Sequence, residues 1–339
     1  MKKIPGILLC LIIALPSWLF GRVFPLIGGP VTAIILGIAV SAVFPKLANS
    51  GWKNIFSFAD GVKFTSKKLL QYSIILLGFD MNLYNVLNAG RLSLAVMFFT
   101  FAAVFLVAFI LGKLLKLSEN TTILIGVGTS VCGGSAIAAA APVINAGDED
   151  VTRSISTIFL YNIAAVFIFP VLGRLLKMND LHFGMWAGTA INDTSSVVAA
   201  ATAWSNYTGN ETALNFATIV KLTRTLMIVP ITLVLAVYTS NKKNQNNAGS
   251  FSFIKVFPWF VLLFIAASII NTFSGLPPAA ASALYQTGKF VIVMAMAAIG
   301  LNTSMKNLFS NGFKPLLLGF FCWLTIASVS IIVQIFISL

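Results

Sequence analysis

The chain has 339 residues, of which 58% are apolar and only 9% charged, and its mean hydropathy is +0.95. Soluble domains carry about 25% charged residues, so this composition excludes a water-soluble globular protein. The net charge of +13 does not indicate a nucleic-acid partner, because the Lys and Arg lie in short connectors, where they set membrane orientation. The sequence predicts an all-α polytopic membrane protein with a single transmembrane domain over residues 1–339.

Apolar stretches long enough to cross roughly 30 Å of hydrocarbon recur along the chain. They predict about eleven transmembrane helices. The first is predicted as a retained N-terminal helix at 1–21, because no small-residue cleavage site follows its apolar run. The predicted spans are 5–21, 24–44, 69–88, 92–112, 121–145, 154–173, 183–203, 214–239, 254–274, 286–305 and 315–338.

The basic residues predict an orientation in a bacterial inner membrane. With the N-terminus in the cytoplasm, the inside connectors hold 16 of the 22 Lys and Arg, and the outside connectors hold four. Because Lys and Arg concentrate in cytoplasmic loops, this orientation is favoured. It places the C-terminus on the periplasmic or extracellular side and the acidic residues 148–150 outside.

The connector at 51–68 combines several lysines with an apolar helical face. This pattern is typical of a cytoplasmic amphipathic helix at the membrane interface, and a plain positive loop is the alternative.

The third and tenth spans share a weak similarity, since residues 78–82 (GFDMN) align with residues 300–304 (GLNTS). In the predicted orientation these two spans run in opposite directions. Similar segments of opposite direction indicate an inverted-topology repeat, which is common in secondary transporters. Chance similarity between two apolar stretches is the alternative.

Residues 121–203 contain the polar and glycine-rich core segments. The fifth span holds four glycines close to several hydroxyl side chains. Glycine is costly inside a helix, and freed backbone groups cannot be left unsatisfied in hydrocarbon, so the pattern predicts a broken helix that lines a binding site. Close packing of small residues is the alternative. The predicted substrate-binding residues here are Thr129, Ser130, Cys132, Gly133, Gly134 and Ser135.

The seventh span contains five consecutive polar residues at 192–196. They would cover every face of an intact helix, so exposure to lipid is excluded. Asp193 is an ionisable group about ten residues into the span, which indicates a functional role, and a structural ion pair is the alternative. Substrate binding is predicted for Asn192, Thr194, Ser195 and Ser196, and ion coupling for Asp193 with Asn192.

The eighth span supplies Lys221 and Arg224, whose spacing puts both side chains on one helix face. Two buried cations beside one carboxylate leave a surplus positive charge, which an anionic substrate would offset. A half-helix beginning near Gly134 would add N–H donors and the positive end of a helix dipole. Both cations are therefore predicted to bind substrate, and snorkelling to the outer headgroups is the alternative.

Neither a metal site nor a catalytic site is predicted. Cys10, Cys132 and Cys322 lack metal-ligand spacing, and the single His182 cannot build a metal site alone. Because no catalytic constellation can be assembled, we predict no enzyme activity and no cofactor.

Residues 128–144, the acidic turn 147–150 and residues 187–201 resemble the sulfate exporter family of bacterial inner-membrane proteins, and the resemblance covers nearly the whole chain. That family is grouped with the cation/proton antiporter and anion transporter superfamily, and residues 133–156 are similar to the bile-acid:sodium symporter pattern. The resemblance implies inverted five-helix repeats, two broken helices that cross at mid-membrane, core and panel domains, and elevator-like movement.

One feature departs from that fold. Its broken helices run antiparallel, whereas the fifth and seventh spans both run outward here. Two explanations of this departure are open. Span ten is the crossing partner of span five, or span seven is a hairpin or flanks the crossing.

The sequence predicts a secondary transporter that moves a small anion, sulfate or another sulfur-containing anion, coupled to an H⁺ or Na⁺ gradient by an elevator mechanism. One alternative is a cation/proton antiporter that uses the Asn192-Asp193 pair, and another is a passive anion channel. The expected partners are the anion, H⁺ or Na⁺ and the lipid bilayer, without nucleic acid, and a homodimer is left open.

Overall fold

A computed structural model of the chain describes residues 3–23, 29–43, 58–242, 259–274, 276–303 and 312–337. Within these ranges every regular element is a helix, which confirms the predicted all-α polytopic membrane protein. Six of the described helices are long and apolar enough to cross a membrane, and three shorter apolar helices accompany them. The six long helices cover Ile4–Val23, Leu83–Leu114, Glu149–Leu175, Thr212–Thr239, Pro278–Asn302 and Phe313–Ile337.

The helices follow one another with few residues between them in the described ranges. In chain order they are α1 (Ile4–Val23), α2 (Gly29–Val43), α4 (Phe58–Phe64), η1 (Thr65–Leu69), α5 (Leu70–Leu77), η2 (Gly78–Asp80), α6 (Leu83–Leu114), α7 (Glu119–Ser130), α8 (Gly134–Val143), α9 (Asp148–Leu175), α10 (Asp180–Ala190), α11 (Thr194–Thr208), α12 (Thr212–Leu226), α13 (Ile228–Lys242), α15 (Trp259–Phe273), α16 (Pro278–Asn302) and α18 (Phe313–Ile337).

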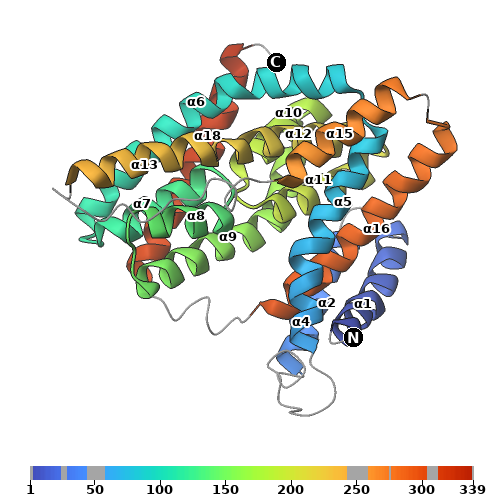
Figure 1. Ribbon diagram of the computed structural model, residues 1–339, viewed down its shortest axis with the longest axis horizontal. Coiled ribbons are helices and arrows are strands. Elements are labelled where there is room, and N and C mark those ends of the chain that lie inside the picture. Colours follow the sequence, from blue (N-terminus) through green and yellow to red (C-terminus); the bar gives the residue numbers. More distant parts are fainter. Residues whose placement is uncertain are drawn as a thin grey trace.

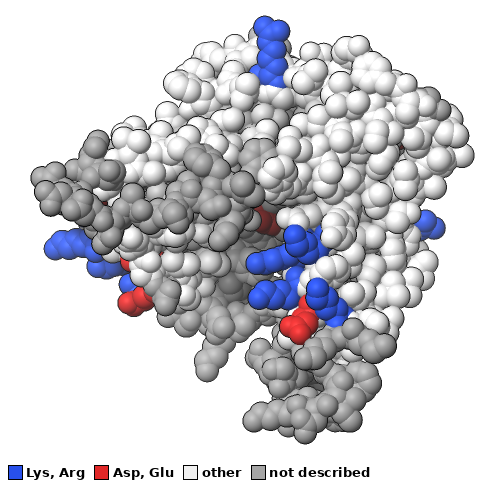
Figure 2. Space-filling model, viewed as in Figure 1, with Lys and Arg blue, Asp and Glu red and all other residues white. Residues whose placement is uncertain are grey.

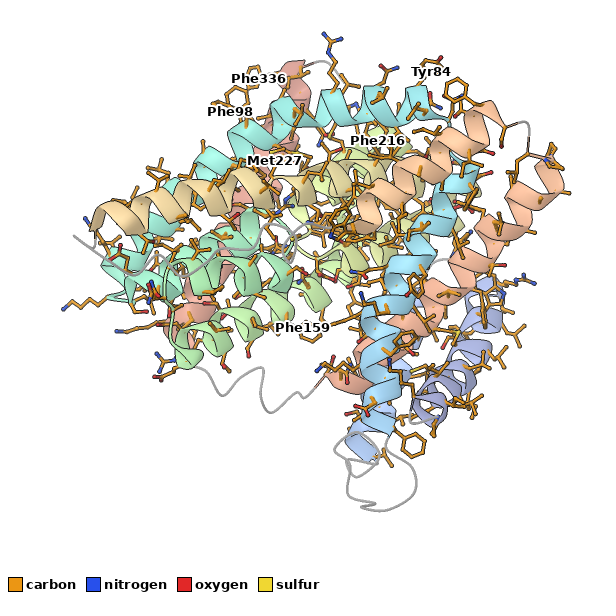
Figure 3. All side chains as sticks on the ribbon, in the orientation of Figure 1. Tyr84, Phe98, Phe159, Phe216, Met227 and Phe336 are labelled. Atoms are coloured by element: carbon orange, nitrogen blue, oxygen red, sulfur yellow. The ribbon has the colours of Figure 1, made fainter. Side chains whose placement is uncertain are left out.

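The outer surface is apolar. Phe98 on α6 and Phe336 on α18 project away from the helices (Figure 3), and they are 70% and 83% exposed. On the face in Figure 2, charged side chains gather mainly in the lower half of the view, and the upper half is almost entirely uncharged. Large contiguous apolar surfaces are rare on soluble proteins, and a hydrocarbon environment accounts for this one.

The helices pack mainly within two groups (Figure 1). The scaffold group consists of α1, α2, α4, α5, α15 and α16. The hairpin group consists of α6 to α13 and α18. Small residues allow close helix contacts: a Cβ at Gly37 of α2 would lie 2.5 Å from the carbonyl oxygen of Ala297 and 2.9 Å from the Cα of Gly300 on α16. Gly300 therefore has a packing role apart from any repeat.

Some predicted boundaries differ from the observed ones. The third span ends at Asp80 and α6 already begins at Leu83, because Asn82 caps α6 by accepting a 2.8 Å hydrogen bond from the Tyr84 amide. The predicted connector 51–68 is described from Phe58 onward, where it is helical and continues through η1 into α5. Its place at the membrane interface stays a prediction. Parts of the predicted spans 24–44, 254–274, 286–305 and 315–338 lie outside the described residues.

Candidate functional site

Helices α7 and α8 form a hairpin, called the first hairpin, whose two ends lie together. The hydroxyl groups of Ser118 and Thr121, at the start of α7, both donate to Oδ1 of Asp150 at 2.6 Å. Asp150 lies in the first turn of α9, only a few residues after α8 ends. The chain therefore runs inward along α7 and returns along α8 to the same end of the molecule.

Helices α10 and α11 form a second hairpin. Asp180 begins α10, and its carboxylate accepts hydrogen bonds from the Trp204 indole at 2.7 Å and the Asn210 amide at 2.8 Å, near the end of α11. The rings of Phe183 and Trp204 stack across the hairpin with centroids 4.1 Å apart. These contacts hold the start of α10 beside the end of α11, so this segment also returns to where it entered.

The bases of the two hairpins lie at opposite ends of α9. This helix has 28 residues and spans about 42 Å. Asp150 joins its first turn to the first hairpin, whereas the Arg174 guanidinium, in its last turn, lies 5.1 Å from the centroid of Tyr207 in the second hairpin. The hairpins therefore enter the hairpin group from opposite sides.

Helices α12 and α13 connect the same two ends in the opposite direction. The Leu214 amide donates to the Ser205 hydroxyl at 3.2 Å, beside the second hairpin base. The Tyr238 hydroxyl donates to Glu119 at 2.8 Å, at the first hairpin base. Helix α12 therefore passes between both hairpins on its way across.

This arrangement corrects the prediction that the spans 121–145 and 183–203 each cross the membrane. Helices α7 and α8 have 12 and 10 residues, or about 18 Å and 15 Å, and each reaches only halfway through roughly 30 Å of hydrocarbon. The turn at 144–147 consequently lies at the same end as the start of α7, so the acidic residues 148–150 are not on the side opposite to the connector 115–118. Two hairpins that enter from opposite sides are antiparallel.

The first hairpin is interrupted where the sequence predicted a broken helix, and the second is interrupted at the start of the polar run 192–196. The first tip, Val131–Gly133, ends with Gly133 at φ +68°, a conformation that favours glycine. The second tip, Ile191–Asp193, is extended at both ends of the break. The tips touch: a Cβ at Gly133 would lie 3.4 Å from the Cβ of Asp193, and the Asp193 amide donates to the Asn162 side chain on α9 at 3.0 Å.

Lys221 and Arg224 join the tips through backbone carbonyl groups, and both are 0% exposed. The Lys221 ammonium donates to the carbonyls of Val131, Ile191 and Asn192. This burial contradicts snorkelling as the role of Lys221. The Arg224 guanidinium donates to the carbonyls of Thr129, Ser130, Thr189 and Ile191.

These carbonyls belong to the C-terminal ends of α7 and α10, whose last carbonyls have no partner within the helix. The negative ends of two helix dipoles therefore point at the cations. The positive ends of α8 and α11 begin on the other side of each tip.

The N-terminal ends of α8 and α11 differ in how they are capped. The N-cap of α8 is Gly133, which has no side chain with which to cap the first N–H groups. Gly134 and Ser135 follow, and Ser135 is exposed, while a Cβ added to Gly134 would meet no atom within 4 Å. The N-cap of α11 is Asp193, whose Oδ2 accepts from the amide and hydroxyl of Ser195. Open space therefore borders the uncapped end of α8.

The other predicted site residues lie around the two tips. Cys132 is buried within the first tip, and Thr194, Ser195 and Ser196 form the first turn of α11 with 5–9% exposure. The side chains of Thr129, Ser130 and Asn192 contain buried polar atoms without a hydrogen-bond partner. The structure thus brings all of the predicted site residues to the hairpin tips or to α12 between them.

From the sequence, Asn162 was expected to form a core hydrogen bond or to cap or bridge the break in the fifth span, and the residues that fasten the hairpin bases were not singled out. Asn162 was detectable, because it is an amide in the middle of a long apolar helix. The Asp180–Trp204 and Ser118–Asp150 pairs carried no signal, since each residue type is ordinary at a helix end.

Comparisons with known proteins give a consistent family. The family model described as conserved hypothetical protein 698 matches residues 5–319. A UPF0324 membrane protein of Fusobacterium nucleatum is 48% identical over 349 residues, which cover 98% of this chain and 98% of the relative. UPF0324 membrane proteins of Streptococcus agalactiae and Streptococcus mutans are 48% and 47% identical, and each alignment covers 98% of this chain and 97% of the relative. No solved structure matches the chain.

Proposed function

This chain belongs to the UPF0324 family of membrane proteins, and we propose that it is a secondary transporter that binds a small anion between its two hairpin tips. The multi-pass helical structure provides the membrane location that the names of its bacterial relatives state. Sulfate or another sulfur-containing anion is the substrate class that its motifs imply by resemblance.

The observation that carries the proposal is the contact between the N-cap residues of α8 and α11, Gly133 and Asp193. Helix N-termini provide free N–H donors and a positive dipole end, and both features favour anions. Discontinuous helices that aim their N-termini at an anionic substrate are a recurring transporter design. Here two such ends meet at the hairpin tips, and the end of α8 has no side-chain cap.

The buried cations add to the positive potential at the tips. Among the described residues, neither Lys221 nor Arg224 forms an ion pair with a carboxylate. Carbonyl oxygens engage the three donors of Lys221 and four of the five donors of Arg224, so the cations act mainly from behind the tips through their charge. Because charge interactions are strong in a poorly polarisable interior, an anion at the tips offsets this excess positive charge.

Unpartnered polar groups mark the same place. Thr129, Ser130 and Asn192 have buried side-chain atoms with no hydrogen-bond partner. Native proteins leave few buried polar groups unpaired, since each one costs about 1–3 kcal/mol. A ligand with several acceptor oxygens would satisfy the hydroxyl and amide donors of this cluster.

The opposed hairpins also support alternating access. Each hairpin enters from its own side of the membrane, so displacement of the first or the second hairpin would open the tips to one side only. The division into a hairpin group and a scaffold group fits an elevator movement of the hairpin group against the scaffold group. The weak similarity between residues 78–82 and residues 300–304 fits an inverted repeat in the scaffold.

Asp193 provides a route for coupling to a proton. Its carboxylate caps α11 and lies where an anion would bind, so its negative charge opposes the substrate. Protonation removes that charge. Binding of the anion together with a proton is therefore favoured over binding of the anion alone.

A stabilisation screen on the purified protein tests the proposal. Sulfate, thiosulfate, sulfite, methanesulfonate and chloride are compared as choline salts at equal ionic strength, and the apparent melting temperature is measured in detergent. We expect a saturable increase with at least one oxyanion that chloride does not reproduce. A response to none of these anions, together with no flux of them into proteoliposomes, contradicts the proposal.

A matched pair of variants locates the response. Thr129→Val and Thr157→Val each replace an unpartnered buried hydroxyl by a methyl group of the same shape, which is nearly neutral or stabilising without a ligand. Thr129 lies at the first tip, whereas Thr157 lies on α9 against Gly319 of α18. Only Thr129→Val should weaken the anion response, and equal responses in both variants would remove Thr129 from the site.

The Asn192-Asp193 pair also supports cation/proton antiport as the alternative, because Asp193 has no cationic partner among the described ion pairs. Sodium-dependent pH changes in vesicles without any oxyanion favour that function. A passive channel is distinguished by flux that neither saturates nor depends on a counter-ion.

A further inference from the structure

Lys221 lies in a cradle of backbone carbonyl oxygens contributed by both hairpin tips. Its Nζ atom is 2.9 Å from the oxygen of Val131 and 3.1 Å from that of Ile191, and it also donates to the oxygen of Asn192. An ammonium group has three donors, and this cradle supplies three acceptors. With Lys221 at 0% exposure, water does not compete for them.

The chemistry of this cradle is that of a small-cation site. In transporters with interrupted helices, unwound carbonyls and half-helix C-termini coordinate Na⁺. The cradle of Lys221 consists of these groups, taken from the ends of α7 and α10. Lysine presents a compact point charge, whereas the planar guanidinium of Arg224 binds as a fork. Lys221 is therefore the residue that resembles a bound monovalent ion.

We infer that Lys221 is a tethered cation that permanently fills a carbonyl-lined monovalent-cation site between the two hairpin tips. The covalently held ammonium takes the place of a bound Na⁺, so the tips are joined without any ion from solution. Of the two ions considered for coupling, Na⁺ is then dispensable, and a proton remains available through Asp193.

Removal of the Lys221 ammonium tests whether the site binds a cation from solution. Without it, the three carbonyl oxygens face one another across a small space at the negative ends of two helix dipoles. A cation from solution that fits the space would restore their partners. Lys221→Ala removes three methylene groups and the ammonium, and the space they leave accommodates ethylammonium, which has the same charge and is one methylene group shorter.

The experiment measures the apparent melting temperature of the purified full chain in choline, sodium, potassium, methylammonium and ethylammonium chloride at equal ionic strength. The wild type should show no preference among these salts. Lys221→Ala should melt at a lower temperature in choline chloride and regain about half or more of the loss with a small cation. Chloride is present throughout, so the anion site contributes equally to every measurement.

Two controls make the result specific. Lys289→Ala removes an ammonium that pairs with the Glu211 carboxylate and should show no cation preference. Lys221→Met keeps most of the side-chain volume without the charge, so it should melt at a lower temperature and gain nothing from ethylammonium.

Three results overturn the inference. One is stabilisation of the wild type by millimolar Na⁺ over choline, which means that the cation site is not filled by Lys221. Another is a folded Lys221→Ala that gains no more from small cations than Lys289→Ala gains. The third result is that Lys221→Met melts at the same temperature as the wild type. This result decides the question if Lys221→Ala does not fold. None of these measurements involves a transported oxyanion, so a negative result does not contradict the proposed function. Conversely, the absence of an anion response does not contradict the inference that Lys221 is a tethered cation.

Discussion

Lys221 and Arg224 donate to the same backbone carbonyl oxygen, that of Ile191, at 3.1 Å and 3.2 Å. Their spacing of three residues puts both side chains on one face of α12. That face contacts the second tip at Ile191, which lies between the two cations. The remaining hydrogen bonds of both cations reach the ends of α7 and α10 and one carbonyl in each tip. One turn of a single helix therefore holds the ends of two hairpins that enter from opposite sides.

Replacement of Arg224 should destabilise the protein strongly. Arg224→Ala leaves the carbonyls of Thr129, Ser130 and Thr189 buried without this donor, and each buried acceptor left unsatisfied costs about 1–3 kcal/mol. The apparent melting temperature in detergent measures the loss. Arg153→Ala, which removes an exposed i,i+4 pair with Glu149, is the control and should cost about 0–1 kcal/mol. Equal melting temperatures for both variants would show that the Arg224 contacts do not stabilise the fold.

The two adjacent glycines of the first hairpin should respond differently to alanine. Gly133 has φ +68° and ψ −132°, so Gly133→Ala is strained by about 1–3 kcal/mol and should lower the melting temperature. A Cβ at Gly134 meets no atom within 4 Å, so Gly134→Ala should melt like the wild type. Its methyl group projects into the space beside the end of α8, and it should weaken stabilisation by the oxyanion identified in the screen.

This pair separates folding from binding. If Gly134→Ala keeps the full anion response, the space at the end of α8 is not the anion site. If Gly133→Ala melts like the wild type, the backbone of the first tip rearranges at little cost.

Asp193 should be replaceable by asparagine for folding but not for proton coupling. Asn caps helices about as well as Asp, whereas Asp193→Ala removes the cap of α11 at a cost of about 0.5–2 kcal/mol. Asp193→Asn should therefore keep its stability and bind the oxyanion with an affinity that no longer changes with pH. Anion titrations at several pH values measure this. A pH dependence identical to that of the wild type would assign proton coupling to another group.

Thiol labelling tests the hairpin topology. Glu149 and Asn210 are exposed near the bases of the first and second hairpins, and the native cysteines are all buried, so background labelling by a membrane-impermeant maleimide should be low. We expect Glu149→Cys to react from the cytoplasmic side and Asn210→Cys from the opposite side of the membrane. Reaction of both from the same side would mean that the segments 121–145 and 183–203 cross the membrane completely.

Hydropathy and residue type predicted much of the site. A run of five polar residues at 192–196 cannot face lipid in any helical register, and paired glycines at 133–134 weaken a helix in any context. The position of both interruptions and the inclusion of Lys221 and Arg224 followed from these rules. The partners of the two cations did not follow, because their acceptors are backbone carbonyls, and every residue carries one.

The sequence by itself determined that this protein is helical and embedded in a membrane, and where its helices break, because these properties depend on local composition and on the cost of burying polar groups. Only the tertiary structure decided that the broken segments turn back. A hairpin of 12 and 10 residues has the same length and hydropathy as one 25-residue span, so a window along the sequence cannot separate them. The difference lies in contacts between distant residues, Ser118 with Asp150 and Asp180 with Trp204, which form only when the chain has folded.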